Sequence, residues 1–388
     1  MSSAPIPYGR QSISAADIQA VVEVLNSNWL TQGPMGELFE RTVADHCGAA
    51  HAVAVNSATS ALHIACLAAG LGPGDILWTS PNTFVASANC GLYCGATVDF
   101  VDIDPRSYNM SIERLAEKLE RAEREELLPK VVIPVHFAGQ SCDMEAIARL
   151  AERYGFTVIE DASHAIGGRY KEEPVGGCRN SAMTVFSFHP VKIITTGEGG
   201  MVLTNSLELN EKLVRLRSHG ITRDPALMTG EPHGPWYYEQ IELGFNYRMT
   251  DIQAALGMSQ MTRLDEFVER RHNLAKRYDE SLDELPLTLP WQHQDAWSAF
   301  HLYVIRLDLG RTGKSHRDIF EALRSQGILV NLHYIPVHTQ PYYRQLGFCT
   351  GDFPEAERYY REAITLPLYA GLSESDQDRV ITALREIL

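Results

Sequence analysis

The sequence predicts an α/β protein with a large domain built on a mainly parallel sheet and a smaller C-terminal α+β domain. A chain of 388 residues with 45% hydrophobic content is long enough for more than one core. From residue 51 onward, short apolar runs alternate with helical patterns of about a dozen residues, which indicates parallel strands covered by helices. After residue 250 a long helical pattern precedes a smaller set of strands and helices. We therefore place the boundary near Thr250, between residues 1–250 and residues 251–388.

The first fifty residues predict two helices joined by a polar turn. Residues 14–27 carry apolar side chains at helical spacing, and Ser14 with Asp17 three residues later is a typical N-terminal cap. Residues 29–34 contain a Thr-Gln-Gly-Pro turn, which is usually only a bend but is also a place for a substrate loop. A second helix is expected from residue 35 to residue 47.

The alternating region predicts the central sheet. We expect strands at residues 52–55, 76–79, 97–103, 131–136, 157–159 and 184–188, and helices at residues 58–69, 85–94, 112–122, 144–154 and 206–218. The irregular stretch 217–238, rich in Gly, Pro and His, is interpreted as a functional loop or an inter-subunit arm.

The C-terminal part predicts the smaller domain. A long helix is expected from a cap at Thr250 to about residue 285. Beyond it we expect strands at residues 303–307 and 328–332, and helices at residues 317–325, 355–363 and 374–388.

Charge and apolar patterning exclude several classes of function. The net charge is −15 and no long basic run is present, which argues against a nucleic-acid or anionic-membrane partner. No run approaches the roughly 18 apolar residues of a membrane span, and the N-terminal segment lacks an apolar leader pattern, so we expect a cytoplasmic protein.

The cysteines predict reduced thiols and no metal site. Seven cysteines spread over a long chain do not form a disulfide framework. Cys90 and Cys94 share a helix face, but without a second pair we interpret them as buried small hydrophobes. His333 and His338 with the distant Cys349 form a still weaker pattern, so we expect no metal.

The sheet topology directs attention to polar residues that follow strands. Ligands of parallel sheets bind at the carboxyl ends of the strands, so such residues are expected to line one rim. They fall at residues 56–59, 82–84, 136–139, 161–164 and 187–189.

Lys192 is the strongest catalytic candidate. It follows the strand at 184–188, which Pro190 ends because proline cannot donate to the ladder. Its apolar neighbours are expected to desolvate the amine and lower its pKa, as a nucleophilic lysine requires. A lone lysine in a loop is more often simply solvated. Residues elsewhere in the chain must therefore show whether Lys192 has a catalytic role. The glycine-rich segment 197–200 is expected to form a turn, and its glycines at positions 197, 199 and 200 permit a close approach of the backbone.

A lysine-linked pyridoxal 5'-phosphate cofactor requires a carboxylate beside its ring nitrogen. Only a protonated ring nitrogen draws electrons strongly from the substrate, and an anionic partner keeps it protonated. Asp161, at the end of an apolar strand, fits this role. An ordinary helix cap or turn residue is the alternative interpretation.

The same cofactor requires a phosphate site and an aromatic platform. Ser57, Ala58 and Thr59 open a helix, whose N-terminal N–H groups attract anions, and Ser187 supplies a second hydroxyl. Phe84, at the next strand end, is placed to stack on a ring. Ordinary helix capping and core packing are the alternatives, but all these features fall at strand ends.

The sequence resembles the DegT/DnrJ/EryC1/StrS family of sugar aminotransferases over nearly its whole length. The resemblance lies in residues 56–62, 160–164, 187–192, 197–200 and 244–251. It implies the aspartate-aminotransferase (type I pyridoxal phosphate) fold, pyridoxal 5'-phosphate as cofactor with pyridoxamine 5'-phosphate as its amino form, and a homodimer with composite active sites.

The resemblance also implies roles for individual residues. Asn246 would reach the phosphate of the neighbouring subunit, and His164 would lie beside the ring oxygen of the cofactor. Lys192, Asp161 and His164 are then the catalytic residues, with Lys192 both holding the cofactor and moving the proton. Pro190 and Val191 depart from the family pattern and affect the expected local loop geometry only.

Further segments resemble family members of pseudaminic acid biosynthesis, at residues 24–27, 30–33, 83–89, 217–220 and 333–336. This likeness implies L-glutamate as amino donor and C4 of a UDP-linked 4-keto-6-deoxy-N-acetylhexosamine as acceptor. Alternatives are a 3-keto sugar, a GDP- or dTDP-linked 4-keto sugar, a pyridoxamine-dependent dehydratase, although such enzymes lack the lysine, or a non-enzymatic regulator that binds the cofactor. Expected substrate contacts are Thr31, Gln32, His219, Arg223, His333 and Tyr334, with Arg10, Arg217 or Arg223 as the cation for the diphosphate.

Overall fold

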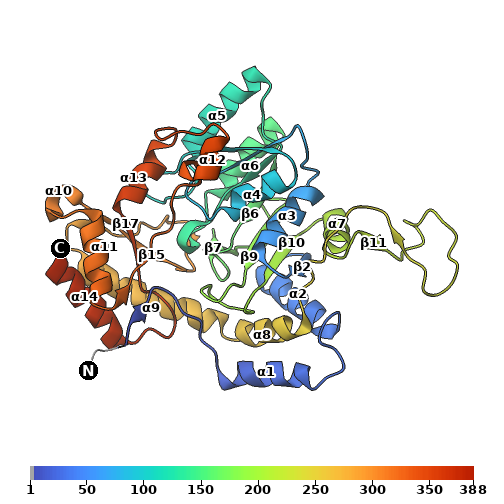
Figure 1. The fold of residues 1–388 in the computed structure, drawn as a ribbon, viewed down its shortest axis with the longest axis horizontal. Helices are drawn as coiled ribbons and strands as arrows, with labels where there is room; N and C mark the ends of the chain where they lie inside the picture. Colours follow the sequence, from blue (N-terminus) through green and yellow to red (C-terminus); the bar gives the residue numbers. More distant parts are fainter. Residues whose placement is uncertain (1–3) are drawn as a thin grey trace.

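A seven-stranded sheet forms the centre of the computed structural model, which describes residues 4–388 (Figure 1). Its strand order is β2-β10-β9-β6-β5-β3-β4. The strands are β2 (His51–Val55), β3 (Ile76–Thr79), β4 (Thr97–Phe100), β5 (Val131–Ile133), β6 (Thr157–Asp161), β9 (Met183–Ser187) and β10 (Gly200–Thr204). The predicted α/β fold with a large, mainly parallel sheet is confirmed.

One strand of this sheet, β10, is absent from the sequence prediction. It lies antiparallel between β2 and β9, whereas β9, β6, β5, β3 and β4 run parallel. Its first residue is Gly200, and the glycines before it give the segment the composition of a turn. The apolar residues 201–203 nevertheless fill the gap between two buried strands, so the interpretation as a turn alone was wrong.

Helices cover both faces of the sheet. Alternate strand residues pack on one face with α3 (Ala58–Ala68), α4 (Ala86–Tyr93) and α7 (Leu207–Arg217). The other residues pack with α2 (Pro34–Cys47) and α8 (Asp251–Met261) at one end of the sheet, and with α5 (Ile112–Glu125) and α6 (Met144–Tyr154) at the other. The predicted three-layer arrangement follows from this alternation, because successive strand side chains point to opposite faces.

Two predicted helix starts have the expected caps. Ser14 and Asp17 form a reciprocal capping box at α1 (Ala15–Leu25), and Thr250 with Gln253 does the same at α8. In Figure 1, α1 lies beneath α8, and the two helices are in contact.

The long helix expected from residue 250 to about 285 is two helices, α8 and α9 (Leu264–Leu282). The backbone leaves helical geometry at Arg263. The guanidinium of Arg263 binds the carboxylate of Asp17, at 2.6 Å, and the carbonyl oxygen of Ser12. These bonds connect the residue between α8 and α9 to the N-terminal segment.

The C-terminal part contains a three-stranded antiparallel sheet of β13 (Leu287–Thr288), β15 (Tyr303–Leu307) and β17 (Ala363–Leu366). Here α11 (His316–Ser325) and α14 (Glu374–Ile387) pack on each other and confirm two predicted helices. The strand β1 (Ile6–Pro7) pairs in parallel with β16 (Ile328–Leu329), so the N-terminal segment joins this part. Shorter elements are β7 (Arg169–Tyr170), β8 (Glu173–Pro174), β14 (Ala296–Trp297), α10 (Leu309–Thr312), α12 (Pro341–Gln345) and α13 (Pro354–Glu362), with 3-10 turns at Phe137–Gly139 and Val337–Thr339.

The irregular stretch after α7 forms an arm that projects from the body (Figure 1, right). Its base is a two-stranded ribbon of β11 (Ile221–Thr222) and β12 (Glu239–Gln240). The carboxylate of Glu239 accepts hydrogen bonds from the N–H groups of Thr229 and Gly230 and from the hydroxyl of Tyr237. These bonds give the arm its own internal order.

Within the described residues, none of the helices combines the length and the apolar character that a bilayer crossing demands.

Candidate active site

A cavity of about 580 Å³ lies at the carboxyl ends of the central strands. This is where a doubly wound sheet binds its ligand. Four of the five predicted strand-end clusters contribute to it: residues 57–59, 83–84, 161–164 (Asp161, Ser163 and His164) and 187–189 (Ser187 and His189). The fifth cluster, residues 136–139, does not line the cavity, and only the preceding residue Val135 does. His136 points away and binds Glu160 on the other side of the sheet, with its Nε2 2.6 Å from the carboxylate.

The N-terminus of α3 forms one end of the cavity. Ser57 caps the helix and its hydroxyl accepts the N–H of Ser60 at 3.1 Å. A side chain at Gly200 would lie 2.5 Å from the carbonyl carbon of Ser57 and 2.6 Å from the nitrogen of Ala58. Glycine is therefore needed for β10 to pass so close to the helix start, as the glycine pattern predicted. Ser187 pairs with Gly200 across β9 and β10.

Lys192 lies on the cavity wall, in the loop that follows β9. Its backbone N–H donates to the carbonyl of His189 at 2.9 Å, which closes a tight turn after Pro190. The surrounding protein desolvates the amine and lowers the pKa of Lys192 to about 8, while the negative charge of Asp161 acts in the opposite direction. An appreciable fraction of the amine is thus neutral near physiological pH, as an attacking amine requires.

Asp161 ends β6 and is buried at the cavity. Its Oδ2 accepts the hydroxyl of Ser87 at 2.6 Å, and its Oδ1 accepts the backbone N–H of Ser163 at 3.1 Å. Donors on both oxygens hold the carboxylate in one orientation. Asp161 does not cap a helix, but its bond to the N–H of Ser163, two residues later, is that of a turn residue, so this part of the alternative interpretation holds alongside its place at the cavity.

His164 and Tyr334 form a hydrogen-bonded pair inside the cavity. The backbone N–H of Ala138 donates to His164 Nδ1 at 3.3 Å, so the ring proton resides on Nε2 and points to the Tyr334 oxygen, 2.9 Å away. Burial lowers the pKa of His164 well below its usual value, and the charge of Lys192 lowers it further. The phenol hydrogen of Tyr334 is then free to donate into the cavity.

Two more histidines line the cavity in neutral form. Burial and the charge of Lys192 lower the pKa of His333 to about 3 and depress the pKa of His301 strongly. His333 Nδ1 lies 2.9 Å from the hydroxyl of Thr365. His301 Nδ1 is buried and has no hydrogen-bond partner among the described residues.

Phe84 stands at the mouth of the cavity. Its side chain is 59% exposed, and its ring centre lies 6.4 Å from that of Tyr334. Core packing, the alternative interpretation of this phenylalanine, therefore does not apply. An exposed aromatic ring at the rim is suited to stacking on a flat ligand.

Several predicted residues lie outside this cavity in a single chain. The described residues that line it do not include Thr31, Gln32, His219, Arg223 or Asn246, all of which are exposed. Thr31 pairs with Thr250, and the carbonyl of Asn246 accepts the side-chain amide of Asn56.

The predicted diphosphate cations also differ in their surroundings. The guanidinium of Arg217 binds the carboxylate of Glu40 and the carbonyl of Ala54, the latter at 2.7 Å, which ties α7 to α2 and β2. It therefore has a structural partner already. Arg10 and Arg223 are exposed.

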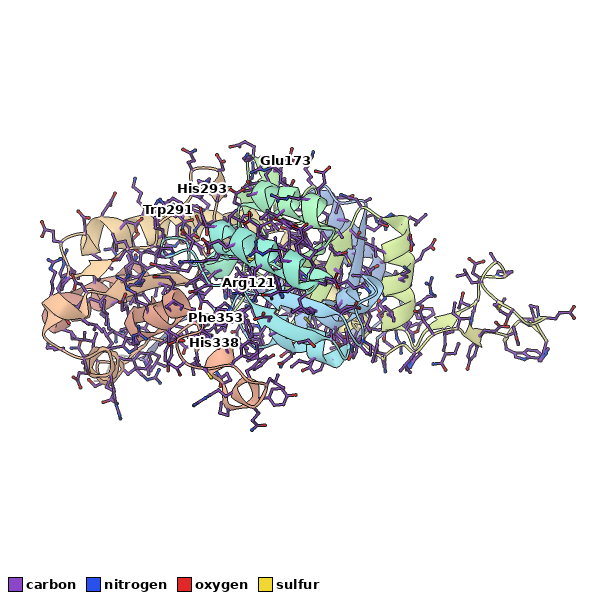
Figure 2. The ribbon with its side chains drawn as sticks, turned by 90° about the horizontal axis from the view of Figure 1, so that it is seen from above. Arg121, Glu173, Trp291, His293, His338 and Phe353 are labelled. Carbon is purple, nitrogen blue, oxygen red and sulfur yellow. The ribbon has the colours of Figure 1, made fainter. Side chains whose placement is uncertain are left out.

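The residues considered as metal ligands occupy separate positions. Cys90 and Cys94 are buried as predicted, and the sulfur of Cys90 lies 3.7 Å from that of Cys66. His338 binds Glu357 at 3.0 Å and packs beside Phe353 (Figure 2), whereas His333 lies in the cavity. No group of three metal-binding side chains was found among the described residues.

Sequence reasoning missed several residues that line the cavity. Tyr8 arrives through the pairing of β1 with β16, and its ring centre lies 5.0 Å from that of His333. His301 comes just before β15, at the amino end of a strand. The sequence analysis considered only residues that follow a strand, so it did not include this position. Glu198 and Asn331, for which no role was predicted, also line the cavity.

The cavity fits pyridoxal 5'-phosphate. A helix N-terminus with flanking hydroxyls suits the phosphate, and Gly200 leaves room for its approach to the backbone. A buried carboxylate, a lysine of lowered pKa and an aromatic ring at the mouth suit the remaining parts of the cofactor. These features define the site of a pyridoxal-phosphate-dependent enzyme of the α/β class.

Comparison with known proteins agrees with this assignment. The family model of the DegT/DnrJ/EryC1/StrS aminotransferases matches residues 11–385, and the chain belongs to this family of sugar aminotransferases. Its cofactor is pyridoxal 5'-phosphate, as predicted.

Individual relatives match over nearly their whole lengths. The spore coat polysaccharide biosynthesis protein SpsC of Bacillus subtilis (strain 168) is 42% identical over 386 residues, which are 99% of this chain and 97% of the relative. Helicobacter pylori PseC, described as an aminotransferase involved in the biosynthesis of pseudoaminic acid, superposes with a TM-score of 0.89 at 32% identity, covering 99% of both chains. The sugar aminotransferase Spr1654 of Streptococcus pneumoniae, solved in PLP and PMP forms, is 29% identical. The PLP form superposes with a TM-score of 0.87, covering 99% of this chain and 100% of that chain. The PMP form superposes with a TM-score of 0.88, covering 99% of this chain and 97% of that chain. The aspartate-aminotransferase type of fold is thereby confirmed.

Proposed function

We propose that the protein transfers an amino group from L-glutamate to C4 of a UDP-linked 4-keto-6-deoxy-N-acetylhexosamine, as a step of pseudaminic acid biosynthesis. The observation that carries the proposal is the lysine of lowered pKa facing a buried carboxylate in a cavity of about 580 Å³. The sugar class is supported by the similarity to PseC and to a polysaccharide biosynthesis protein.

Lys192 has two tasks in this proposal. Its Nζ holds the cofactor between turnovers, and after the amino acid has replaced it, the neutral amine carries a proton between the substrate carbon and the cofactor carbon. A pKa near 8 suits both directions of that transfer, because the amine gains and loses a proton at little cost. When bound, the cofactor supplies an electron-withdrawing ring that stabilises charge at the substrate carbon.

Other residues hold the ligand groups in place. The carboxylate of Asp161 would face the ring nitrogen and keep it protonated. Phe84 would cover the ring face, and Tyr334, held by His164, would direct the free hydrogen of its phenol toward the ring oxygen. Ser57, Ala58, Thr59 and Ser187 bind the phosphate.

The second half of the reaction uses the same groups. L-Glutamate would leave as 2-oxoglutarate, and Lys192 would again move the proton when the keto sugar accepts the amino group at C4. His333 and Tyr334 line the cavity where the sugar would lie.

We also propose a homodimer with composite active sites. Large apolar side chains are exposed on α1 and the turn after it, including Ile18 and Trp29, and on the arm and its base, where Trp236 is 72% and Leu243 79% exposed. Such exposure marks an interface, and a second copy of the chain is the proposed partner. Asn246 lies near the base of the arm, and in this arrangement it reaches the phosphate of the neighbouring subunit.

The same arrangement accounts for the predicted substrate residues that lie outside the cavity. Thr31, Gln32, His219 and Arg223 are exposed, and we propose that they complete the cavity of the partner subunit. Arg223 and Arg10 remain the candidate cations for the diphosphate. We retain residues 1–250 and 251–388 as the proposed domains, and all seven thiols are unpaired, which supports a reducing cytoplasmic location.

Mixed dimers test the composite site. Lys192→Ala and Asn246→Ala each damage both sites of a homodimer, but a mixed dimer places both substitutions in one composite site and leaves the other intact. Mixing the two inactive variants after subunit exchange should therefore restore activity. Exchange without any recovery would contradict the composite arrangement.

A panel of nucleotide keto sugars tests the substrate. The holoenzyme is incubated with L-glutamate and UDP-, GDP- or dTDP-linked 4-keto sugars or a 3-keto sugar, and products are identified by mass spectrometry. We expect amination of the UDP-linked 4-keto-6-deoxy-N-acetylhexosamine. Preference for another sugar would overturn the substrate assignment, and loss of water without amination would indicate a dehydratase.

A further inference from the structure

Ser87 lies behind Asp161 and has no assigned role. It belongs to the first turn of α4, is fully buried, and its hydroxyl lies 2.6 Å from Asp161 Oδ2. The hydroxyl of Thr83 lies 2.7 Å from the same oxygen of Ser87. The three side chains form a buried row that ends on the carboxylate.

The direction of these hydrogen bonds follows from the groups involved. A hydroxyl has one hydrogen, and a carboxylate is a stronger acceptor than the carbonyl of Phe84, which lies 3.3 Å from Ser87 Oγ. Ser87 therefore donates to Asp161, and Thr83 donates to Ser87. A donor that itself accepts a hydrogen bond is polarised, which strengthens its bond to the anion.

The same turn carries the predicted platform of the cofactor ring. Phe84 stands between Thr83 and Ser87 in sequence, and its carbonyl accepts the backbone N–H of Ser87 at 3.2 Å. Residues 83–87 thus fix Phe84, which covers the ring face, and Ser87, which orients the carboxylate at the ring edge. A rotation of the Asp161 carboxylate would break its hydrogen bond to this turn.

We infer that Ser87, polarised by Thr83, is a positioning residue that holds Asp161 anionic and correctly oriented toward the ring nitrogen of the cofactor. The inference rests on the role of Asp161 in the proposed function. Without the hydroxyl, the carboxylate loses one of its two donors, and the proton shared with the ring nitrogen shifts toward the carboxylate. The ring then withdraws fewer electrons.

Spectroscopy distinguishes this role from a structural one. The nitrogen of Lys192 in the bound cofactor titrates with a change in visible absorbance, and a ring with less positive charge lets that nitrogen keep its proton to higher pH. Ser87→Ala is therefore expected to move the pH midpoint of the absorbance upward. It should also slow the reaction with saturating L-glutamate about tenfold, which corresponds to about 1.4 kcal/mol.

Further variants provide the comparison. Ser80→Ala removes another buried hydroxyl from the same loop, one without a hydrogen-bond partner among the described residues, and should leave both quantities unchanged. Ser87→Cys, with a weaker donor of similar size, should give an intermediate effect in the same direction. Thr83→Val should also give an intermediate shift of the midpoint and an intermediate rate. Ser87→Thr keeps the hydroxyl and should retain the wild-type midpoint.

Asp161→Asn separates the inference from the proposed function on which it rests. If Asp161→Asn changes the absorbance midpoint and the rate while Ser87→Ala and Ser87→Cys match the wild type, the role of Ser87 is overturned. If Asp161→Asn itself changes neither quantity, the proposed role of Asp161 fails, and the inference fails with it. Melting temperatures of all variants establish that each one is folded.

Discussion

Replacing Lys192 by methionine is expected to stabilise the cofactor-free protein at neutral pH. The folded protein lowers the pKa of this amine from 10.5 to about 8 through burial. Below pH 8 the amine is protonated in both the folded and the unfolded chain, and the folded chain bears the full cost of the buried charge. Between pH 8 and pH 10.5 only the unfolded chain remains largely protonated, so stability rises with pH and the cost disappears.

The size of the effect follows from the same pKa difference. A difference of about 2.5 pH units at about 1.36 kcal/mol each gives about 3 kcal/mol. Solvent reaches the amine through the cavity and screens it, so we expect about 1–2 kcal/mol. For 388 residues the entropy of unfolding is roughly 0.8 kcal/mol per degree, so the melting temperature should rise by about 1–3 °C.

Differential scanning calorimetry of the cofactor-free proteins, at one protein concentration and at several pH values from 7 to 10.5, measures this difference. Lys276→Met, on an exposed side chain, is the control for the change of residue type. The reasoning is refuted if Lys192→Met gives no stabilisation at pH 7, or if its stabilisation persists unchanged at pH 10.5.

Three further predictions concern other parts of the molecule. Gly200→Ala places a methyl group within about 2.6 Å of the backbone at the start of α3 and should weaken binding of pyridoxal phosphate at least about tenfold in a fluorescence titration. Gly36→Ala, where nothing lies within 4 Å, should leave binding unchanged. Phe84→Ala should speed cofactor release about tenfold in dialysis without lowering the melting temperature of the cofactor-free protein, because the ring is exposed; slower release would contradict its stacking role. Arg217→Met removes the cation beside the carboxylate of Glu40, which keeps only the backbone N–H of Ala54, and should destabilise the protein by about 2–3 kcal/mol in calorimetry, with turnover per bound cofactor within about twofold of wild type; a selective rise in the KM of the nucleotide sugar would instead place it at the substrate.

The sequence predicts those parts of the site that depend on local periodicity. Strands and helices alternate regularly from residue 51, and residues that follow a strand must gather at one edge of a parallel sheet. This rule located Lys192, Asp161, Ser57 and Phe84, and all four line the same cavity. Helix caps such as Ser14 were predictable for the same reason, since their hydrogen bonds span only three residues.

Residues brought together by long-range contacts were not predictable in this way. Tyr8 enters the cavity only because β1 pairs with β16, more than 300 residues later in the chain. Arg217 has the composition of a ligand-binding cation, but its partner Glu40 is 177 residues away. The strand that begins at Gly200 was hidden because its glycines, required by the approach to α3, resemble a turn. Each of these contacts depends on the assembled tertiary structure.

The central claim is that Lys192 holds the cofactor and moves the proton of an amino-group transfer. A single-turnover experiment tests it directly. L-Glutamate is added to purified holoenzyme without a sugar acceptor, the visible absorbance of the bound cofactor is followed, and the products are identified by mass spectrometry. We predict that the absorbance is lost, with one equivalent each of 2-oxoglutarate and pyridoxamine 5'-phosphate per active site, and that Lys192→Ala reconstituted with the cofactor forms neither at a comparable rate. Equal conversion by Lys192→Ala, or no conversion by the wild type, would contradict the account.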